Sequence, residues 1–421
     1  MRILTTLPRA GLLGLALAAL ASCGAVSGPL DSSPRPPARA EQMDENMRPR
    51  PNAGFSNWVA GYRPRALSAG VSGATFDRAF ASAGYIPGVI EKDRNQAEFT
   101  KTLGEYLSTA ASDTRVETGR AMLSQYSSLL SEIEARYGVD RQTVLAVWGM
   151  ESNFGKRRGD VPVVSALATL AYEGRRGRFF EQQLTSALKI LQNGDVSPEN
   201  MKGSWAGAMG HTQFIPTSYE AYAADFRGDG RRDIWSDDPT DGLASTAKYL
   251  SNFGWRKGQP WGVEVVLPQG FNYGLAGGTK KSAAEWQSLG VQAASGGRIG
   301  DFGAAEILVP EGAQGAAFMT FRNFDVIKRY NAADAYAIGV GHLGDRIAGA
   351  GPLRTKMATG RALKRAERSE IQRRLTALGY DTGGADGIIG PNSIAAIRSY
   401  QQANGLPVDG FASESLLKRL R

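Results

Sequence analysis

A single cysteine, Cys23, is the feature that most limits what this chain of 421 residues can fold into. One cysteine excludes an internal disulfide and any zinc or iron–sulfur centre that needs several cysteine ligands. The only two histidines, His211 and His342, exclude a histidine-rich metal site as well. The fold must therefore be held by hydrophobic cores, and a chain of this length with 42% hydrophobic residues can form two or three domains.

The cysteine follows a short apolar segment at the N-terminus. Basic residues precede an apolar run over residues 11–20, which is too short for a membrane span and is typical of a secretory signal. Leu20-Ala21-Ser22-Cys23 resembles the bacterial lipobox, in which cleavage leaves a lipidated cysteine. We therefore expect a signal peptide over 1–23, lipidation of Cys23 and a location at the periplasmic face of the outer membrane. An ordinary signal peptide with an accidental cysteine is the alternative.

The remaining chain divides by composition. Residues 24–52 are rich in Pro, Ser and Arg and predict a flexible tether. A mainly α globular domain is expected over 53–350, with a Gly-rich, strand-prone insertion over about 260–312. A basic linker over 351–368 then precedes a separate unit over 369–421. Helical spacing of apolar residues is clearest over residues 117–137, 140–151, 162–193 and 323–348.

The segment VLAVWGMESNFG carries the sharpest chemical signal. On a helix that starts near Asp140, Glu151 shares one face with Val144 and Trp148. A carboxylate at the end of an apolar stripe loses solvation, which raises its pKa and suits a general acid. Gly155 is expected to end this helix. From spacing alone, a Glu that only bonds to a neighbouring helix is an equally good interpretation.

A second block, SWAGAMGHTQFIP over residues 204–216, places small residues between Trp, Met and Phe side chains. Small residues let backbones approach closely and leave Ser204 and Gln213 to point into a cleft. Aromatic rings stack on sugar faces and amides bond to hydroxyl groups, so such a cleft suits a sugar chain. A Gly-rich turn that packs under Trp205 is the structural alternative.

Three blocks together resemble the membrane-bound lytic murein transglycosylase B family: ESNFG, then SWAGAMG with QFIPTS, then NFDVIKRYN followed by YA. The blocks occur in the family's order, and the similarity covers about residues 55–350. The resemblance implies an enzyme that cleaves peptidoglycan. The expected fold class is thus mainly α (α+β), with a lysozyme-like catalytic core, a small β-containing insertion and a C-terminal three-helix domain.

The resemblance also implies roles for individual residues. Glu151 matches the family's catalytic acid/base. Where the family often has Ser two positions after Asn331, this chain has Ala333, which cannot supply that hydroxyl group. The residues that match positions in the substrate cleft are Ser204, Gln213, Tyr249, Tyr330, Asn331 and, as a weaker match, Tyr106.

The reaction implied by the resemblance is non-hydrolytic cleavage of the β-1,4 bond between MurNAc and GlcNAc, which leaves a 1,6-anhydro end. Hydrolases commonly need two carboxylates about 5–9 Å apart. No second carboxylate is obvious near Glu151 in sequence, and Asp160, Glu173 and Glu181 could serve only through tertiary contacts. The alternatives are a muramidase that hydrolyses the same bond and a non-catalytic murein-binding lipoprotein.

The segment DFRGDGRRD, which starts at Asp225, resembles the opening of a calcium-binding loop. Arg227 at its third position and Ser236 at its twelfth both weigh against a bound cation. The family can bind a cation in the corresponding loop with a later Asp, so Asp225, Asp229 and Asp241 are weak candidate ligands. We expect no required cofactor and favour a metal-free loop, with a structural Ca²⁺ as the alternative.

Residues 369–421 predict three helices around a Gly/Asp loop, the third over 415–420. The block DGIIGPNS, which starts at Asp386, resembles the small peptidoglycan-binding domain, and the later VDG around Asp409 repeats half of it. A helical cap without a ligand is the alternative. The apolar stripes of the first two helices are Ile371, Leu375 and Leu378, then Ile394, Ile397 and Tyr400.

Charge and histidine usage bound the remaining options. The net charge of +8 suits an anionic polymer but, beside an export signal, does not argue for nucleic acid. His211 and His342 have no partner carboxylate in the sequence, so we interpret them as positional or packed. The expected partners are peptidoglycan glycan strands and the membrane, reached through the lipid on Cys23, and a monomer is the default.

Overall fold

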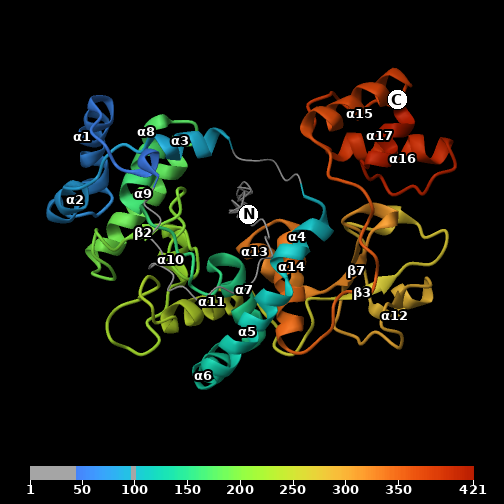
Figure 1. Cartoon of the computed structure of the whole chain (residues 1–421), viewed down its shortest axis with the longest axis horizontal. Helices are drawn as coiled ribbons and strands as arrows, with labels where there is room; N and C mark the ends of the chain where they lie inside the picture. The colour runs from blue at the N-terminus through green and yellow to red at the C-terminus, as the bar shows by residue number, and fades with distance from the viewer. Residues whose placement is uncertain (1–43, 96–100) are drawn as a thin grey trace, which may run out of the picture.

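The computed structural model describes residues 44–95 and 101–421, and most of its elements are helices (Figure 1). The predicted mainly α fold with a small β part is confirmed. The described residues form three hydrophobic cores. The first lies within two packed groups of helices, the second belongs to a sheet, and the third lies among the last three helices. The predicted signal peptide and Cys23 lie outside the described residues.

Helix α8 (Val163–Glu173) is the centre of the first helical group, on the left of Figure 1. Nine successive residues, from Val163 to Ala171, are buried, because other helices cover it on several sides. The helical character predicted over 162–193 is confirmed, and the stretch forms two helices because Gly174 takes a φ of 87° and ends α8. The surrounding helices are α1 (Ala53–Ser68), α2 (Gly73–Phe80), α3 (Pro87–Arg94), α9 (Gly177–Gln192) and α10 (Pro216–Tyr222).

Helix α7 (Arg141–Ser152) is the centre of the second group. The helix predicted over 117–137 breaks at Tyr126, and the one predicted over 323–348 breaks at Asn331, where the backbone is extended. These breaks let α14 lie along α7 while α13 turns away. The other helices of the group are α4 (Leu103–Ala110), α5 (Asp113–Gln125), α6 (Ser127–Tyr137), α11 (Thr240–Asn252), α13 (Arg322–Tyr330) and α14 (Asp334–Ile347).

The strand-prone insertion forms an antiparallel sheet in the order β4-β6-β7-β3-β5. Met319 stands between Val263 and Ile307 in the register, and helix α12 (Ala283–Ser288) covers the sheet with the buried Trp286. A separate ribbon pairs β1 with β2. The strands are β1 (Val161–Pro162), β2 (Lys202–Gly203), β3 (Gly262–Val266), β4 (Lys280–Lys281), β5 (Gln292–Ala293), β6 (Ala305–Leu308) and β7 (Ala317–Thr320).

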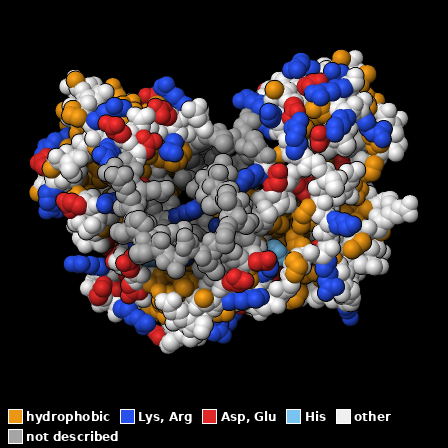
Figure 2. Space-filling model, viewed as in Figure 1, with side chains coloured by type: hydrophobic (Ala, Val, Ile, Leu, Met, Phe, Trp, Pro, Cys, Tyr) orange, Lys and Arg blue, Asp and Glu red, His pale blue; other side chains and the backbone are white. Residues whose placement is uncertain are grey.

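The C-terminal unit consists of α15 (Arg365–Ala377), α16 (Pro391–Ala403) and α17 (Glu414–Leu420). Its core includes Ile371, Leu375 and Ile397, as predicted, but Leu378 is 57% exposed because α15 ends just before it. The predicted stripe is therefore wrong at that residue. Lys and Arg side chains are prominent on the face of this unit that Figure 2 shows.

Two glutamines reveal the internal repeat of the C-terminal unit. The side chain of Gln372 donates to Asp386 Oδ1 and accepts from the backbone N–H of Gly387. Gln401 makes the same pair of bonds, to Asp409 Oδ1 and from the N–H of Gly410. Each Asp-Gly turn is thus fastened to the preceding helix by one buried amide.

Residues 44–52, the end of the predicted tether, are folded. Met47 is buried against α3, and the backbone of Arg50 pairs with that of Tyr85. The tether prediction is wrong for this stretch, because its composition hides one apolar anchor. Within residues 44–95 and 101–421, no helix has the length and apolar character needed to cross a bilayer.

The predicted linker 351–368 is also bound to the fold. Glu264 accepts hydrogen bonds from the N–H groups of Arg354 and Thr355, and buried Glu311 accepts one from that of Ala358. Helix α15 begins inside the predicted linker, at Arg365. These carboxylates lie in the sheet region, far away in sequence, so a free linker was the wrong expectation.

Candidate active site

Helix α7 carries Glu151 in its last turn. Val144 and Trp148 on the same helix are buried, as the predicted apolar stripe requires. The helix ends at Asn153, whose φ of 50° makes it the left-handed cap. The prediction that Gly155 ends the helix is therefore wrong by two residues. Asn tolerates this backbone conformation better than most residues other than Gly.

A tyrosine from α14 bonds to the carboxyl group of Glu151. The hydroxyl of Tyr336 donates to Glu151 Oε1 at 2.5 Å. Burial raises the pKa of Glu151 to about 7, and the bond from Tyr336, which favours the charged form, limits this rise. A carboxyl group with that pKa can give up a proton and take one back near neutral pH.

Two predicted cleft residues, Tyr106 and Tyr330, also lie close to Glu151. Burial and the charge of Glu151 raise the pKa of both phenols, so both stay protonated. Tyr106 lies against Gly339 of α14, and the hydroxyl of Tyr330 donates to the carbonyl oxygen of Thr212 at 2.7 Å. The structure therefore surrounds the carboxyl group with protonated tyrosines.

Tyr249 and Asn331 contact the residues that surround Glu151 and form no hydrogen bond with Glu151 itself. The ring centroid of Tyr249 lies 4.9 Å from that of Tyr330, and its hydroxyl donates to the carbonyl oxygen of Arg329 at 2.6 Å. Asn331 Oδ1 accepts from the N–H of Ala333 at 3.0 Å, at the start of α14. In this arrangement both residues support Tyr330 and α14, and their contact with a substrate stays a prediction.

The side chains of Ser204 and Gln213, in the block over 204–216, form hydrogen bonds with backbone groups. Ser204 Oγ accepts two backbone N–H groups of its loop, at 3.0 and 3.3 Å. Gln213, with a φ of 50°, donates through Nε2 to the carbonyl oxygens of Arg158 and Gly210. Among the described residues nothing donates to Gln213 Oε1, which leaves this atom for a ligand. A sugar contact by either residue stays a prediction.

His211 forms hydrogen bonds with two residues of α7. Trp148 Nε1 donates to His211 Nδ1 at 2.9 Å, so the ring proton is on Nε2, which donates to the carbonyl oxygen of Ser236 at 2.8 Å. Ser152 Oγ donates to the backbone oxygen of His211. Burial lowers the pKa of His211, and it lowers that of His342 on α14 to about 4. Both rings are thus neutral, packed groups.

No carboxylate among the described residues shifts the pKa of Glu151. Of the candidates for a second acid, Glu173 and Glu181 form ion pairs with arginines of α3 and α1, and Asp160 is exposed. Tyr336 is the functional residue that the sequence alone does not single out. Its only signal is its place in the YA pair of the third block, because the packing of α14 on α7 is what brings it to Glu151.

The loop that starts at Asp225 is held by its own backbone. The carboxylate of Asp225 accepts three N–H groups, that of Asp229 one and that of Asp241 two. Arg227 forms an ion pair with Glu132 at 2.6 Å. In the part of the chain that the structure describes, no group of three or more His, Cys, Asp or Glu is placed to hold a metal. Whether this loop binds a cation stays a prediction.

Comparison with known proteins agrees with this geometry. The transglycosylase SLT domain model matches residues 54–345, and the putative peptidoglycan binding domain model matches residues 364–420. The chain is 34% identical over 237 residues to membrane-bound lytic murein transglycosylase B of Escherichia coli (strain K12), a match that covers 55% of this chain. It spans slightly less than two thirds, 64%, of that relative.

Solved structures give a closer match. SltB3 from Pseudomonas aeruginosa, in complex with NAG-anhNAM-pentapeptide, is 49% identical with a TM-score of 0.84, over 88% of this chain and 100% of that one. The lytic transglycosylase Slt35 of Escherichia coli, in complex with calcium, is 28% identical with a TM-score of 0.60, over 70% of this chain and 93% of that one. From its fold, its acid-bearing helix and the match over residues 54–345, the chain belongs to the transglycosylase SLT domain family.

Proposed function

We propose that the protein is a lytic murein transglycosylase that cleaves the β-1,4 bond between MurNAc and GlcNAc in peptidoglycan. One observation carries this proposal: Glu151 has a pKa of about 7 and no carboxylate among the described residues acts on it. Similarity to SltB3 from Pseudomonas aeruginosa, solved with NAG-anhNAM-pentapeptide and with NAG-NAM-pentapeptide, supports the substrate.

The reaction needs one group that is first an acid and then a base. Protonated Glu151 gives its proton to the glycosidic oxygen, and the bond between that oxygen and C1 of MurNAc breaks. The resulting carboxylate takes the proton of the MurNAc C6 hydroxyl, whose oxygen then bonds to C1. The product is a 1,6-anhydro ring, no water is consumed, and Glu151 is protonated again.

Tyr336 prepares Glu151 for both steps. Its hydroxyl donates to Oε1, and Oε2 is left for the proton transfers with the substrate. When Glu151 loses its proton, the same hydrogen bond stabilises the carboxylate, and it weakens when the proton returns. A pKa near neutrality is what a group with two opposite roles requires, since neither protonation state is strongly favoured.

Mass spectrometry of the products tests this proposal. The form without residues 1–23 is incubated with purified sacculi, beside its Glu151→Gln variant. We expect muropeptides lighter by one water molecule than hydrolysed ones, and none with the variant. Products with a reducing end would identify a muramidase, while binding to sacculi without release would identify a non-catalytic murein-binding protein.

We propose that lipid on Cys23 anchors the protein at the periplasmic face of the outer membrane, and that the C-terminal unit holds peptidoglycan. The lipobox-like residues 20–23, the membrane-bound relative and the match over 364–420 support this. Labelling with a palmitate analogue, followed by membrane fractionation, should detect lipid on the full chain and not on Cys23→Ser. Deletion of 369–421 should reduce pelleting with sacculi.

We also propose that the Asp225 loop keeps its shape without a metal and that the enzyme requires no cofactor. The backbone bonds to Asp225 and Asp241 support this, as does the cation Arg227 inside the loop. Thermal unfolding in a chelator and in millimolar Ca²⁺ should give the same midpoint. A midpoint raised by Ca²⁺ and lowered again in Asp225→Asn would establish the alternative, a structural calcium site.

A further inference from the structure

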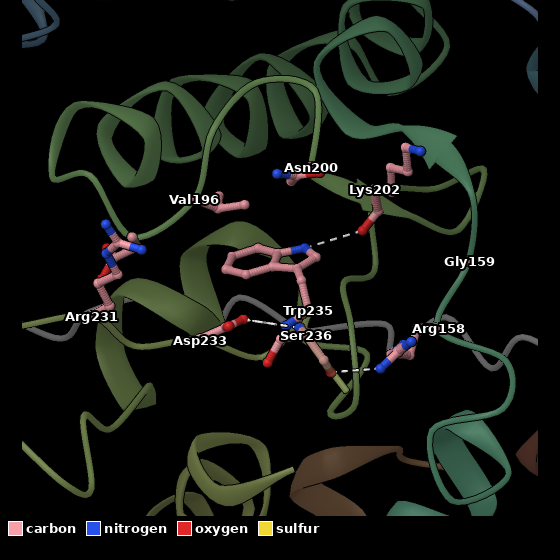
Figure 3. A pocket seen from close by; sticks show the side chains of 10 residues that line it. Arg158, Gly159, Val196, Asn200, Lys202, Arg231, Asp233, Trp235 and Ser236 are labelled. Carbon is pink, nitrogen blue, oxygen red and sulfur yellow. Dashed lines mark hydrogen bonds between the residues drawn. The ribbon is translucent and has the colours of Figure 1, made fainter. Parts of the chain in front are cut away.

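A cavity lies close to the loop that carries Ser204 and Gln213. It has a volume of about 460 Å³ and lies between the segment after α9 and the loop before α11 (Figure 3). None of the residues assigned to the Glu151 site lines it. The lining residues are Arg158, Gly159, Asp195, Val196, Asn200, Lys202, Arg231, Asp233, Trp235 and Ser236.

Trp235 gives the cavity an aromatic surface. Its indole lies in the middle of Figure 3, with Val196 and Asn200 on one side. Trp235 Nε1 donates to the carbonyl oxygen of Lys202 at 3.1 Å, and its ring lies 5.3 Å from that of Tyr219. The indole is thus fixed in place and only partly buried. A rigid aromatic face of this kind packs well against the C–H groups of a sugar ring.

The two carboxylates that line the cavity, Asp195 and Asp233, accept hydrogen bonds from protein groups. Asp195 is buried and bonded to Arg232, which donates to both of its oxygens. Asp233 Oδ1 accepts the backbone N–H groups of Trp235 and Ser236. The charge of Asp195 is therefore offset by Arg232. Asp233 keeps its negative charge, but the lining cations Arg158, Lys202 and Arg231 outnumber it.

Two of the cationic side chains that line the cavity have N–H groups without a partner among the described residues. The side chains of Lys202 and Arg231 are exposed and form no ion pair or hydrogen bond with the residues that the structure describes. Asn200 is exposed in the same way. A third cation, Arg158, is held by the carbonyl oxygen of Ser236 and by Asp237. Unpaired ammonium and guanidinium groups beside an aromatic face select a ligand with both carboxylate and sugar character.

We propose that this cavity is a second, non-catalytic binding site for a carboxylate-bearing saccharide, namely a peptidoglycan disaccharide with its peptide. The inference rests on the proposed function for the identity of that saccharide. The sugar ring packs on Trp235, and Lys202 and Arg231 bind the carboxylates. The backbone joins this site to the first, because Lys202 precedes Ser204 by two residues and the carbonyl oxygen of Arg158 accepts Gln213 Nε2.

The test follows the indole N–H signals of the full chain, which has 7 Trp, by NMR. The tryptophans are isotope-labelled, and Glu151→Gln prevents turnover. The Trp235 signal is assigned with Trp235→Phe, and the Trp148 signal reports on the helix of Glu151. The probe is NAG-NAM-pentapeptide, and the neutral disaccharide diacetylchitobiose is the comparison. We expect the peptide-bearing probe to shift the Trp235 signal at lower concentration than the neutral sugar does.

Removing the two free cations should weaken this binding. The double variant Lys202→Gln, Arg231→Gln should raise the dissociation constant read from Trp235 about tenfold, which corresponds to about 1.4 kcal/mol. The matched control is Arg78→Gln, Lys92→Gln, which removes the same charge from exposed positions on α2 and α3. Neither control residue lines the cavity, so the control should keep the parent affinity.

Three results would overturn the inference: a Trp235 signal that does not move at millimolar probe, equal affinities of the two double variants, or equal affinities for the charged and neutral probes. Failure of the proposed function reads differently. In that case the parent chain without the Glu151 substitution would release no anhydro products from sacculi, whatever the Trp235 signal does.

Discussion

Tyr336 donates its hydroxyl to Glu151 Oε1 at 2.5 Å, although 185 positions separate the two residues in the chain. Two opposing effects meet at this bond. Burial favours the neutral carboxyl group, and the hydrogen bond favours the carboxylate. Burial has the larger effect, so the pKa of Glu151 rises from 4.5 to about 7. The same residue can therefore serve as acid and as base, and the following predictions depend on this balance.

The rate should fall as pH rises through about 7. Glu151 must be protonated to act first as an acid, and above its pKa the protonated fraction drops about tenfold for each pH unit. A profile of kcat/KM between pH 5 and 9 on soluble glycan strands measures this limb. A midpoint near 4.5, the ordinary value for Glu, would contradict the effect of burial.

Tyr336→Phe should move that limb to higher pH. Without the hydroxyl, only burial acts on Glu151, so its pKa rises further, by about one unit for the loss of one charge-assisted bond. The matched control is Tyr249→Phe, whose hydroxyl bonds to the backbone of Arg329 and not to Glu151. An unmoved or lowered midpoint in Tyr336→Phe would show that this bond does not tune the acid.

Glu151→Gln should reduce product formation at least about 100-fold without loss of stability. Gln cannot donate or accept a proton in the reaction, but it has the size of Glu and removes a buried ionisable group. Release of soluble muropeptides and thermal unfolding at pH 7 give the two readouts. Substantial remaining turnover by a folded variant would require another acid.

Stability should increase with pH between about 4 and 6.5, partly through His342. Burial lowers its folded pKa to about 4, so the unfolded chain binds the extra proton in this window. The folded protein gains up to about 3 kcal/mol across it, with the full value reached above pH 6.5. His342→Gln should flatten this dependence, which denaturant unfolding at several pH values would measure. An unchanged slope would assign the effect to other groups.

Gly210→Ala should destabilise the loop that carries Gln213. Gly210 has a φ of 60°, and an added Cβ would lie 2.0 Å from the backbone oxygen of Ile234. We expect a loss of at least about 3 kcal/mol. Gly228→Ala is the matched control, because its φ of 79° carries the same strain but its Cβ would meet nothing within 4 Å. That variant should lose only about 1 kcal/mol, and equal losses in calorimetry would rule out the steric argument.

Local patterns predicted much of this molecule. The apolar stripe of Val144 and Trp148 gave both the helix and the buried position of Glu151, because helical spacing alone decides which residues share a face. The Asp-Gly repeat of the C-terminal unit was equally visible. Helix ends were less predictable, since Asn153 ends α7 two residues before the glycine that the sequence favours.

Contacts between distant segments were beyond the reach of sequence patterns. Nothing in the neighbourhood of Tyr336 indicates a carboxylate partner, because α14 meets α7 only in the packed fold. The hydrogen bonds of Ser204 and Gln213 within their own loop are a second case, since a polar residue between apolar ones reads the same whether it faces a ligand or the backbone.

The carboxylates of Glu264 and Glu311 have a mechanical consequence. They bind the backbone of residues 354–358, and Asp409 of the C-terminal unit accepts the N–H of Ala313 near the sheet. The segment that connects the sheet to the C-terminal unit is therefore held to the sheet region by hydrogen bonds. A force applied to the C-terminal helices would reach the sheet directly through these hydrogen bonds.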